Sequence, residues 1–317
     1  MLVQQSSLKD EIMRLKKEKD VVILAHNYQI PDVQDVADFT GDSLGLSRQA
    51  AKVPQKTILF CGVHFMAETA AIICPDKRVL IPDLDAGCSL SDSINVDELR
   101  NWKKQHPGAI AVGYVNTTAE IKSELDYCCT SANAVNVVKA IPADKEILFL
   151  PDMFLGSYVA KVTGRKNMFI WAGECHVHAG IKPEDITNKL NSLQDAEFLI
   201  HPECSCTTPM MYDAASGSFD NQKVSILSTE GMLNHVNNSK AKNFVVATET
   251  GILYKMRQQN PGKNFIPASE KAECQYMKMI TLDKVYNALA QDKNQVVVPK
   301  EIADKARLAI ERMLAIS

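Results

Sequence analysis

The stretch ILFCGVHFMAETAA at residues 58–71 returns in a weakly similar form as ILFLPDMFLGSYVA at residues 147–160. Each copy begins with a short run rich in aliphatic and aromatic residues, which is typical of a buried strand, and continues into a helical stretch. Seven further strand-like runs lie at residues 21–28, 78–84, 109–116, 167–174, 197–203, 223–229 and 243–249. Because helical stretches separate these runs, the pattern predicts an α/β protein with parallel sheets and helical crossovers.

Each third of the chain carries the same three features in the same order. A polar pair spaced i, i+2 ends a strand, a small hydroxyl residue follows at an expected helix start, and a cysteine closes the third. The polar pairs are His26/Tyr28, Tyr114/Asn116 and His201/Glu203, the hydroxyl residues are Ser43, Ser131 and Ser228 or Thr229, and the cysteines are Cys88, Cys175 and Cys274.

The spacing of these features supports an internal repeat. The first residue of the polar pair precedes the hydroxyl residue by 17, 17 and 27 positions in the three thirds, and the hydroxyl residue precedes the cysteine by 45, 44 and 46 positions. We therefore predict three homologous three-layer α/β/α domains related by a pseudo-threefold axis, with the active site at their centre.

The repeats also suggest where the domains begin and end. We predict a first domain from residues 1–87 together with 275–317, a second from 88–174 and a third from 175–274. The C-terminal stretch PKEIADKARLAIERMLAI at residues 299–316 has the apolar pattern of an amphipathic helix, and we expect it to pack back onto the first domain.

Composition excludes several classes of protein. The chain has 317 residues, 46% of them hydrophobic, and a formal net charge of −3 without a long basic run, so nucleic acid is not an expected partner. Its apolar runs are far shorter than the roughly 20 residues that a membrane span needs. The N-terminus carries no apolar signal region. We expect a cytoplasmic protein that does not bind membranes.

The nine cysteines indicate a metal site rather than disulfides. Their number is odd, no secretion signal is visible, and no CxxC pair occurs, which argues against a zinc finger. If the three units face one axis, Cys88, Cys175 and Cys274 converge. Three thiolates suit an iron–sulfur cluster with one iron open to substrate, although zinc is also compatible with three cysteines.

The hydroxyl residues point to anion binding. Ser43, Ser131 and the pair Ser228–Thr229 each precede a helical run, where free N–H groups and the helix dipole favour phosphate or carboxylate. Any one of them alone is best interpreted as an N-cap. Three at equivalent positions favour a binding role. The chain has no GxxxxGK[ST] motif, so a nucleoside triphosphate is not implied.

Many short motifs, in order along nearly the whole chain, resemble those of the quinolinate synthase family. They are AHNYQ (25–29), GDSLGLSRQAA (41–51), DLDAGCS (83–89), GYVNTTAE (113–120), CTSANA (129–134), PDMFLG (151–156), WAGECHVH (171–178), HPEC (201–204), TEGM (229–232), ATETG (247–251) and CQYMKM (274–279). Because no single motif carries the resemblance, it is highly specific.

The resemblance implies a transferase of de novo NAD biosynthesis. Such an enzyme condenses iminoaspartate with dihydroxyacetone phosphate to give quinolinate, phosphate and two waters. It implies one [4Fe–4S] cluster, a Lewis acid held by Cys88, Cys175 and Cys274, and L-aspartate oxidase as a functional neighbour that supplies iminoaspartate.

The residue types suit that chemistry. We expect Glu203 and His201 to transfer protons, and Tyr28 and His26 to donate hydrogen bonds or protons to the substrate. We expect the other predicted residues to bind phosphate, carboxylate or hydroxyl groups of the substrates; they are Tyr114, Asn116, His178, Ser43, Ser131, Ser228 and Thr229.

Other residues near these motifs have a structural interpretation. We expect the pairs Cys128–Cys129 and Cys204–Cys206 to stay out of the cluster, because a fourth ligand would close the reactive iron. We expect Tyr276 and Met277 to be packing residues and His176 to be structural or exposed. Two other functions remain open, an iron–sulfur hydro-lyase acting on a small hydroxy acid and a sensor whose cluster or zinc is only structural.

Overall fold

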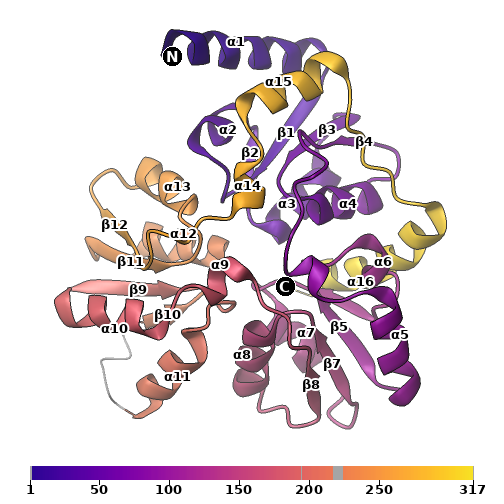
Figure 1. Ribbon diagram of the computed structural model, residues 1–317, viewed down its shortest axis with the longest axis vertical. Coiled ribbons are helices and arrows are strands. Elements are labelled where there is room, and N and C mark those ends of the chain that lie inside the picture. Colours follow the sequence, from indigo (N-terminus) through magenta and orange to yellow (C-terminus); the bar gives the residue numbers. More distant parts are fainter. Residues whose placement is uncertain (1, 194, 217–223, 317) are drawn as a thin grey trace.

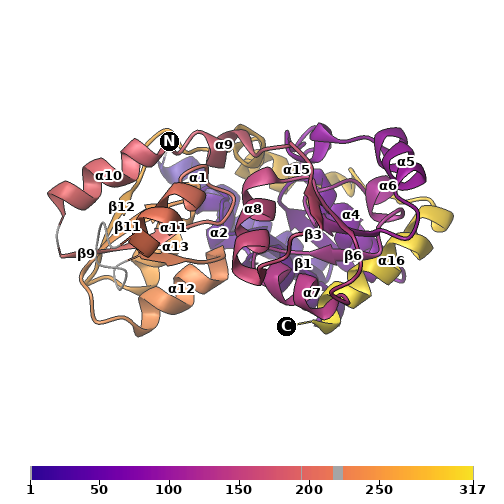
Figure 2. The ribbon, with the colours of Figure 1, turned by 90° about the horizontal axis from the view of Figure 1, so that it is seen from below.

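The computed structural model describes residues 2–193, 195–216 and 224–316. Its strands form three parallel four-stranded sheets with the same connection pattern, β2-β1-β3-β4, β6-β5-β7-β8 and β10-β9-β11-β12. Figure 1 shows the three sheets as three lobes around a common centre, and Figure 2 shows the molecule turned by 90°. Each sheet is flanked by helices, so the predicted α/β fold with three α/β/α units is confirmed.

The strand bounds place the strand ends that carry the site. The first sheet contains β1 (Val21–His26), β2 (Phe39–Gly41), β3 (Thr57–Cys61) and β4 (Arg78–Leu80). The second contains β5 (Ile110–Tyr114), β6 (Tyr127–Cys129), β7 (Ile147–Leu150) and β8 (Met168–Ile170). The third contains β9 (Ala196–Ile200), β10 (Val224–Ile226), β11 (Asn243–Ala247) and β12 (Asn264–Pro267).

The helices cover the faces of these sheets. Their bounds are α1 (Leu2–Glu18), α2 (Pro31–Val36), α3 (Ser43–Lys52), α4 (His64–Ile73), α5 (Val96–Gln105), α6 (Ala119–Lys122), α7 (Ala134–Ala140), α8 (Met153–Thr163), α9 (His176–Ala179), α10 (Pro183–Ser192), α11 (Thr207–Ser216), α12 (Thr229–Asn238), α13 (Ile252–Gln259), α14 (Gln275–Lys278), α15 (Leu282–Gln291) and α16 (Lys300–Ala315). A short 3₁₀ turn, η1, spans Ser91–Ser93. No helix in the described ranges combines the length and the apolar character needed to cross a membrane.

The central strands are buried on both faces. All six residues of β1 and all four residues of β7 are buried, which explains why these strands read as continuous apolar runs rather than as alternating ones. A large apolar core extends through the first and second units into the third, and a smaller core lies within the third unit. The carboxyl ends of the parallel strands are therefore held by a packed framework.

The C-terminal helices join the first two units. The helix α15 packs against α1, and the segment after it pairs with β4 through the bridge between Leu80 and Gln295. The helix α16 packs against α4 of the first unit and also against α6 and β6 of the second. This last helix thus contacts both units, whereas the sequence pattern suggested packing against the first.

Candidate functional site

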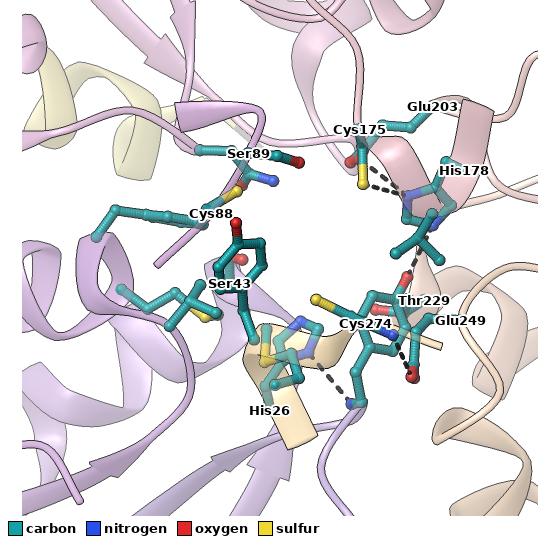
Figure 3. A pocket seen from close by; sticks show the side chains of 18 of the residues that line it. His26, Ser43, Cys88, Ser89, Cys175, His178, Glu203, Thr229, Glu249 and Cys274 are labelled. Carbon is teal, nitrogen blue, oxygen red and sulfur yellow. Dashed lines mark hydrogen bonds and ion pairs between the residues drawn. The ribbon is translucent and has the colours of Figure 1, made fainter. Parts of the chain in front are cut away.

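A cavity lies where the carboxyl ends of the three sheets meet (Figure 3). His26 is the last residue of β1, Tyr114 is the last residue of β5, and His201 directly follows β9. These are the first strands of their units, so the repeat brings their polar ends to one place. The predicted site residues that line the cavity are His26, Tyr28, Ser43, Cys88, Tyr114, Asn116, Ser131, Cys175, His178, His201, Glu203, Thr229 and Cys274.

Glu203 lies at the centre of the polar part of this cavity and is buried. The hydroxyl of Tyr114 donates a hydrogen bond to its Oε1, and Nδ1 of His178 lies 3.2 Å from its Oε2. Burial raises the pKa of Glu203, but the imidazoles of His178 and His201 outweigh that effect, so the pKa is lowered. Glu203 is therefore a buried carboxylate rather than a neutral acid.

Three of the four imidazoles that line the cavity have shifted pKa values, and these three differ in charge. Burial would lower the pKa of His178, but the thiol of Cys175 and the carboxylate of Glu203 raise it, so this ring is protonated. Burial lowers the pKa of His26 and of His201 to about 3, so both are neutral at pH 7. The site thus holds one imidazolium beside two neutral imidazoles, which is a suitable set for moving protons.

Two buried polar atoms in the cavity are free to bind a ligand. Nδ1 of His201 and Oδ1 of Asn116 have no hydrogen-bond partner among the described residues. Buried polar atoms are rarely left unpaired, so each of these atoms indicates a missing donor or acceptor. A substrate with hydroxyl, carboxylate or imine groups would supply such partners.

A chain of hydrogen bonds connects the first and third units across the cavity. The hydroxyl of Tyr28 lies 2.5 Å from Oγ1 of Thr248, and Nε2 of His178 lies 2.9 Å from the same oxygen. Thr248 follows β11 directly, in the motif ATETG. The sequence-based selection missed Thr248, although its place at a strand end was a usable signal.

The three predicted metal ligands come from three separate segments. Cys88 lies in the loop before η1, and Cys175 and Cys274 each precede a one-turn helix, α9 and α14. Figure 3 shows their sulfur atoms directed into the same cavity. All three are half-buried, whereas the other six cysteines are buried and do not line the cavity. The predicted set is therefore spatially distinct from the remaining cysteines.

The charges around these thiols fit a bound metal group. Burial and the neighbouring Cys274 raise the pKa of Cys88 to about 12, and burial also raises the pKa of Cys175 and of Cys274. None of the described side chains that line the cavity is a lysine or an arginine. The His178 imidazolium lies 3.3 Å from Sγ of Cys175, and Lys278 lowers the pKa of Cys274, but neither charge is shared by all three thiols. A metal group bound between the thiols would supply positive charge to three thiolates at once.

A second donor set overlaps with the first. One ligand atom from each of Cys175, His178 and Glu203 lies within 4.8 Å of the others. Nδ1 of His178 lies 3.3 Å from Sγ of Cys175 as well as near Glu203, so these donors already satisfy one another. The site could hold a metal through either set, and Cys175 belongs to both.

The hydroxyl residues occupy different places at the helix starts. Ser43 and Thr229 are the first residues of α3 and α12, and Ser131 lies three residues before α7. The caps come from the preceding residues: Asp42 accepts a hydrogen bond of 2.7 Å from the N–H of Gly45, and Ser228 caps α12. Ser228 does not line the cavity, and its cap bond is the structural interpretation that applies to a lone N-cap serine.

Several cavity residues were not selected from the sequence. Tyr276 and Met277, expected to be packing residues, both line the cavity, as does His176. Nδ1 of His176 lies 2.6 Å from the hydroxyl of Ser89, which also lines it. The remaining lining residues are Asp42, Val63, Phe65, Met66, Gly87, Thr130, Val177 and Glu249.

Comparison with known proteins places the chain in a family. The family model described as "Quinolinate synthetase A protein" matches residues 10–315. The chain is 53% identical over 306 residues to the quinolinate synthases of Mycobacterium sp. (strain KMS) and Pyrobaculum aerophilum, covering 96% of this chain and 91% and 98% of the two relatives. It is 52% identical to that of Mycobacterium tuberculosis (strain ATCC 25177 / H37Ra), covering 96% of this chain and 88% of the relative.

One solved structure shows a much weaker likeness. It is the E-1-hydroxy-2-methyl-but-2-enyl-4-diphosphate reductase of Plasmodium falciparum, with 11% sequence identity and a TM-score of 0.34 over 90% of this chain and 94% of that one. A likeness at this level identifies neither fold nor function.

Proposed function

Since the chain belongs to the quinolinate synthase family, we propose that it condenses iminoaspartate with dihydroxyacetone phosphate to give quinolinate, phosphate and two waters. One observation carries the proposal at the level of the site. A buried carboxylate, an imidazolium, two neutral imidazoles and three thiols from separate segments line a single cavity. The reaction needs proton transfers, anion binding and activation of leaving hydroxyl groups, and these residue types supply them.

The anionic groups of the substrates have hydroxyl and backbone donors available. Ser43 and Thr229 begin α3 and α12, where N–H groups of the first turn are free of intrahelical partners. Ser131 adds a third hydroxyl beside the second sheet. We assign phosphate and carboxylate binding to these positions, and hydroxyl or imine binding to Asn116 through its unpaired Oδ1.

We assign proton transfer to Glu203 and the residues around it. The Glu203 carboxylate is ionised, so it can accept a proton from the carbon next to the carbonyl of the triose phosphate. His201 is neutral, and its Nδ1 lies 3.8 Å from Oε1 of Glu203 without a hydrogen-bond partner among the described residues, so it can accept or pass on a proton at that atom. The hydroxyl of Tyr28 and the ring of His26 also line the cavity, and we assign them to binding and orienting the other substrate.

We also propose that Cys88, Cys175 and Cys274 hold a [4Fe–4S] cluster. When bound, it would supply a Lewis-acidic iron that polarises a hydroxyl or carboxylate of the substrate. Three half-buried thiols without a lysine or arginine among the described lining residues support this assignment. Zinc on the same thiols, or a metal on Cys175, His178 and Glu203, is the alternative. A cluster of this kind also implies a reducing compartment, such as the cytoplasm.

Iminoaspartate hydrolyses readily in water, so we infer a source close to the enzyme. An L-aspartate oxidase that forms this imine is the functional neighbour we propose.

The direct test is an anaerobic assay of protein with a measured iron and sulfide content. Dihydroxyacetone phosphate is mixed with iminoaspartate formed from oxaloacetate and ammonia, and quinolinate is sought by mass spectrometry. We expect product that depends on the bound metal. Absence of product from loaded protein with both substrates verified would overturn the proposal, and an iron–sulfur hydro-lyase or a sensor would then be tested with small hydroxy acids.

A further inference from the structure

The structure assigns a positioning role to an ion pair at the edge of the cavity, formed by Glu249 and Lys278. We propose that this pair holds the backbone at Cys274 and the backbone at Tyr28 in fixed positions relative to each other. The metal-ligating thiol of Cys274 and the substrate-binding phenol of Tyr28 then keep a constant distance and orientation. The inference rests on the proposed function for the roles of Cys274 and Tyr28, whereas the pair itself is defined by its contacts.

Glu249 is buried at the end of the third sheet, directly after Thr248, and lines the cavity. Its Oε1 lies 2.6 Å from Nζ of Lys278 and also accepts a hydrogen bond of 3.1 Å from the backbone N–H of Cys274. Its Oε2 accepts a hydrogen bond of 2.7 Å from the N–H of Gly251. Both oxygens are therefore committed to the protein, which suits a positioning group better than a proton carrier.

Lys278 holds the backbone of Cys274 at its carbonyl group. Lys278 is the last residue of α14, and its backbone N–H donates a hydrogen bond of 3.1 Å to the carbonyl of Cys274. The peptide N–H of Cys274 is held by Glu249 and its carbonyl by the backbone of Lys278. The backbone N–H and the carbonyl of Cys274 are thus both held by the two residues that form the ion pair.

The same lysine also holds Tyr28. Nζ of Lys278 donates a hydrogen bond of 2.6 Å to the carbonyl of Tyr28, which belongs to the loop after β1. The other end of Tyr28, its hydroxyl, is bound to Thr248. Tyr28 is therefore held at both ends by residues that neighbour or belong to the ion pair.

The backbone approach in this region leaves little room for a looser arrangement. A Cβ atom added at Gly251 would lie 2.7 Å from the carbonyl oxygen of Tyr28 and 2.8 Å from Oε2 of Glu249. Nε2 of Gln34 also donates a hydrogen bond of 3.1 Å to the carbonyl of Gly251. The loop after β1 and the segment after β11 are therefore in close contact at the place where the ion pair links them to Cys274.

Charge explains why this link is sensitive to a single substitution. Glu249 is fully buried, so removing the ammonium leaves its carboxylate without a partner of opposite charge. Removing the carboxylate leaves the ammonium with its bond to the Tyr28 carbonyl but without its ion pair, and takes away the acceptor of the Cys274 N–H. In either case the Cys274 segment and the Tyr28 segment lose a contact that they share. Removing a group that supports a metal ligand typically lowers activity or metal affinity roughly 10- to 100-fold.

The test compares Glu249→Gln and Lys278→Met with Lys16→Met as the matched control. Lys16 also pairs with a carboxylate and a carbonyl, since its Nζ lies 3.0 Å from Oδ1 of Asp38 and 3.2 Å from the carbonyl oxygen of Val36, but it does not line the cavity. We expect kcat to fall roughly 10- to 100-fold in both site variants, with a smaller change in KM, and Lys278→Arg to recover part of the loss. Lys16→Met should leave both constants unchanged.

A second readout needs neither metal nor substrate. In the metal-free protein, the alkylation rate of Cys274 by iodoacetamide is compared with that of Cys88 in the same sample by peptide mass spectrometry. We expect the ratio to rise roughly tenfold in both site variants because the Cys274 segment opens more often, and to stay constant in Lys16→Met.

The direction of the change in the alkylation rate of Cys274 distinguishes an effect of its position from an effect of the nearby charges. Glu249 raises the pKa of Cys274 and Lys278 lowers it, so an effect of charge alone would change the alkylation rate in opposite directions in the two variants. Opposite directions, or unchanged ratios, would overturn the inference, as would kinetic constants like those of Lys16→Met. If the unmodified protein made no quinolinate, the proposed function would fail, and the alkylation ratio would still decide this inference.

Discussion

Nδ1 of His178 lies 3.2 Å from Oε2 of Glu203, and the two side chains expose 4% and 3% of their surface. Two opposite charges are therefore buried together at the centre of a cavity formed by three sheets. Such a pair is costly to desolvate and rarely contributes much to stability by itself. Its place beside three thiols and two neutral imidazoles indicates that it serves the chemistry of the site.

Replacing Glu203 by glutamine is expected to lower turnover strongly while leaving the fold intact. An amide cannot accept the proton that the carboxylate takes, and loss of a general base typically costs roughly 100- to 10,000-fold in rate. The measurement is kcat for quinolinate formation, with iron content determined on the same samples.

Glu197→Gln is the matched control for this prediction. Glu197 lies on β9, the strand that precedes Glu203, but its carboxylate binds His235 at 2.7 Å and does not line the cavity. We expect normal turnover from this variant. If Glu203→Gln kept turnover within about twofold of the unmodified protein, Glu203 would not be the base.

Single replacement of Cys88, Cys175 or Cys274 by alanine is expected to abolish binding of the cluster. The three thiols face one cavity, so each loss leaves an iron without its ligand. Iron content after anaerobic reconstitution should fall from roughly four atoms per chain to a small fraction of that. Cys206→Ala should keep its iron, because Cys206 is buried outside the cavity.

His178→Ala separates the two donor sets. If the three cysteines hold the metal, this variant retains iron and loses activity. If Cys175, His178 and Glu203 hold it, His178→Ala loses the metal whereas Cys274→Ala keeps it. The second pattern would contradict the proposed ligand set.

The sequence predicted those features of the fold and the site that recur in each third of the chain. The polar pairs end the first strand of each unit, so one strand pattern and one rule for parallel sheets place six side chains correctly at one edge. Thr248 and Glu249 directly follow β11, which is not the first strand of its unit, and the repeat pattern did not include the end of that strand.

Other features depend on packing that no local pattern encodes. The contact between Glu249 and Lys278 joins residues 29 positions apart and requires α14 to lie against the loop after β1. Tyr276 and Met277 pack against the apolar core, as predicted, and the single turn of α14 also brings both to the lining of the cavity. The role of Ser228 as a cap, and of Thr229 as a lining residue, is likewise decided by the exact residue at which α12 begins.

Gly251→Ala is expected to destabilise the contact between the first and third units. The backbone angles at this position suit alanine, with φ −58° and ψ −28°, so the cost is steric. The added methyl group would lie 2.7 Å from the carbonyl oxygen of Tyr28, and forced shifts of this kind typically cost about 1–3 kcal/mol. Thermal or urea unfolding measures the loss. Gly262→Ala is the control, since nothing lies within 4 Å of its added Cβ, and equal stability of the two variants would contradict the contact.

His26 is expected to make the folded protein sensitive to mild acid. Burial lowers its pKa to about 3, whereas the same group in the unfolded chain titrates near 6.5. Above pH 6.5 the ring is neutral in both states and contributes nothing to the pH dependence. As the pH falls below 6.5, the unfolded chain binds a proton that the folded protein excludes, so stability is lost progressively down to about pH 3. At pH 5 this amounts to about 2 kcal/mol for one histidine.

Urea unfolding of the metal-free, reduced protein at pH 7.5 and pH 5 measures this loss of stability, and His26→Gln should lose about 2 kcal/mol less between these values than the unmodified protein. His235→Gln, with a ring that is one-third exposed (33%), is the matched substitution without burial and should show no such gain. Equal pH dependence of the unmodified protein and His26→Gln would show that the folded protein admits the proton at this ring.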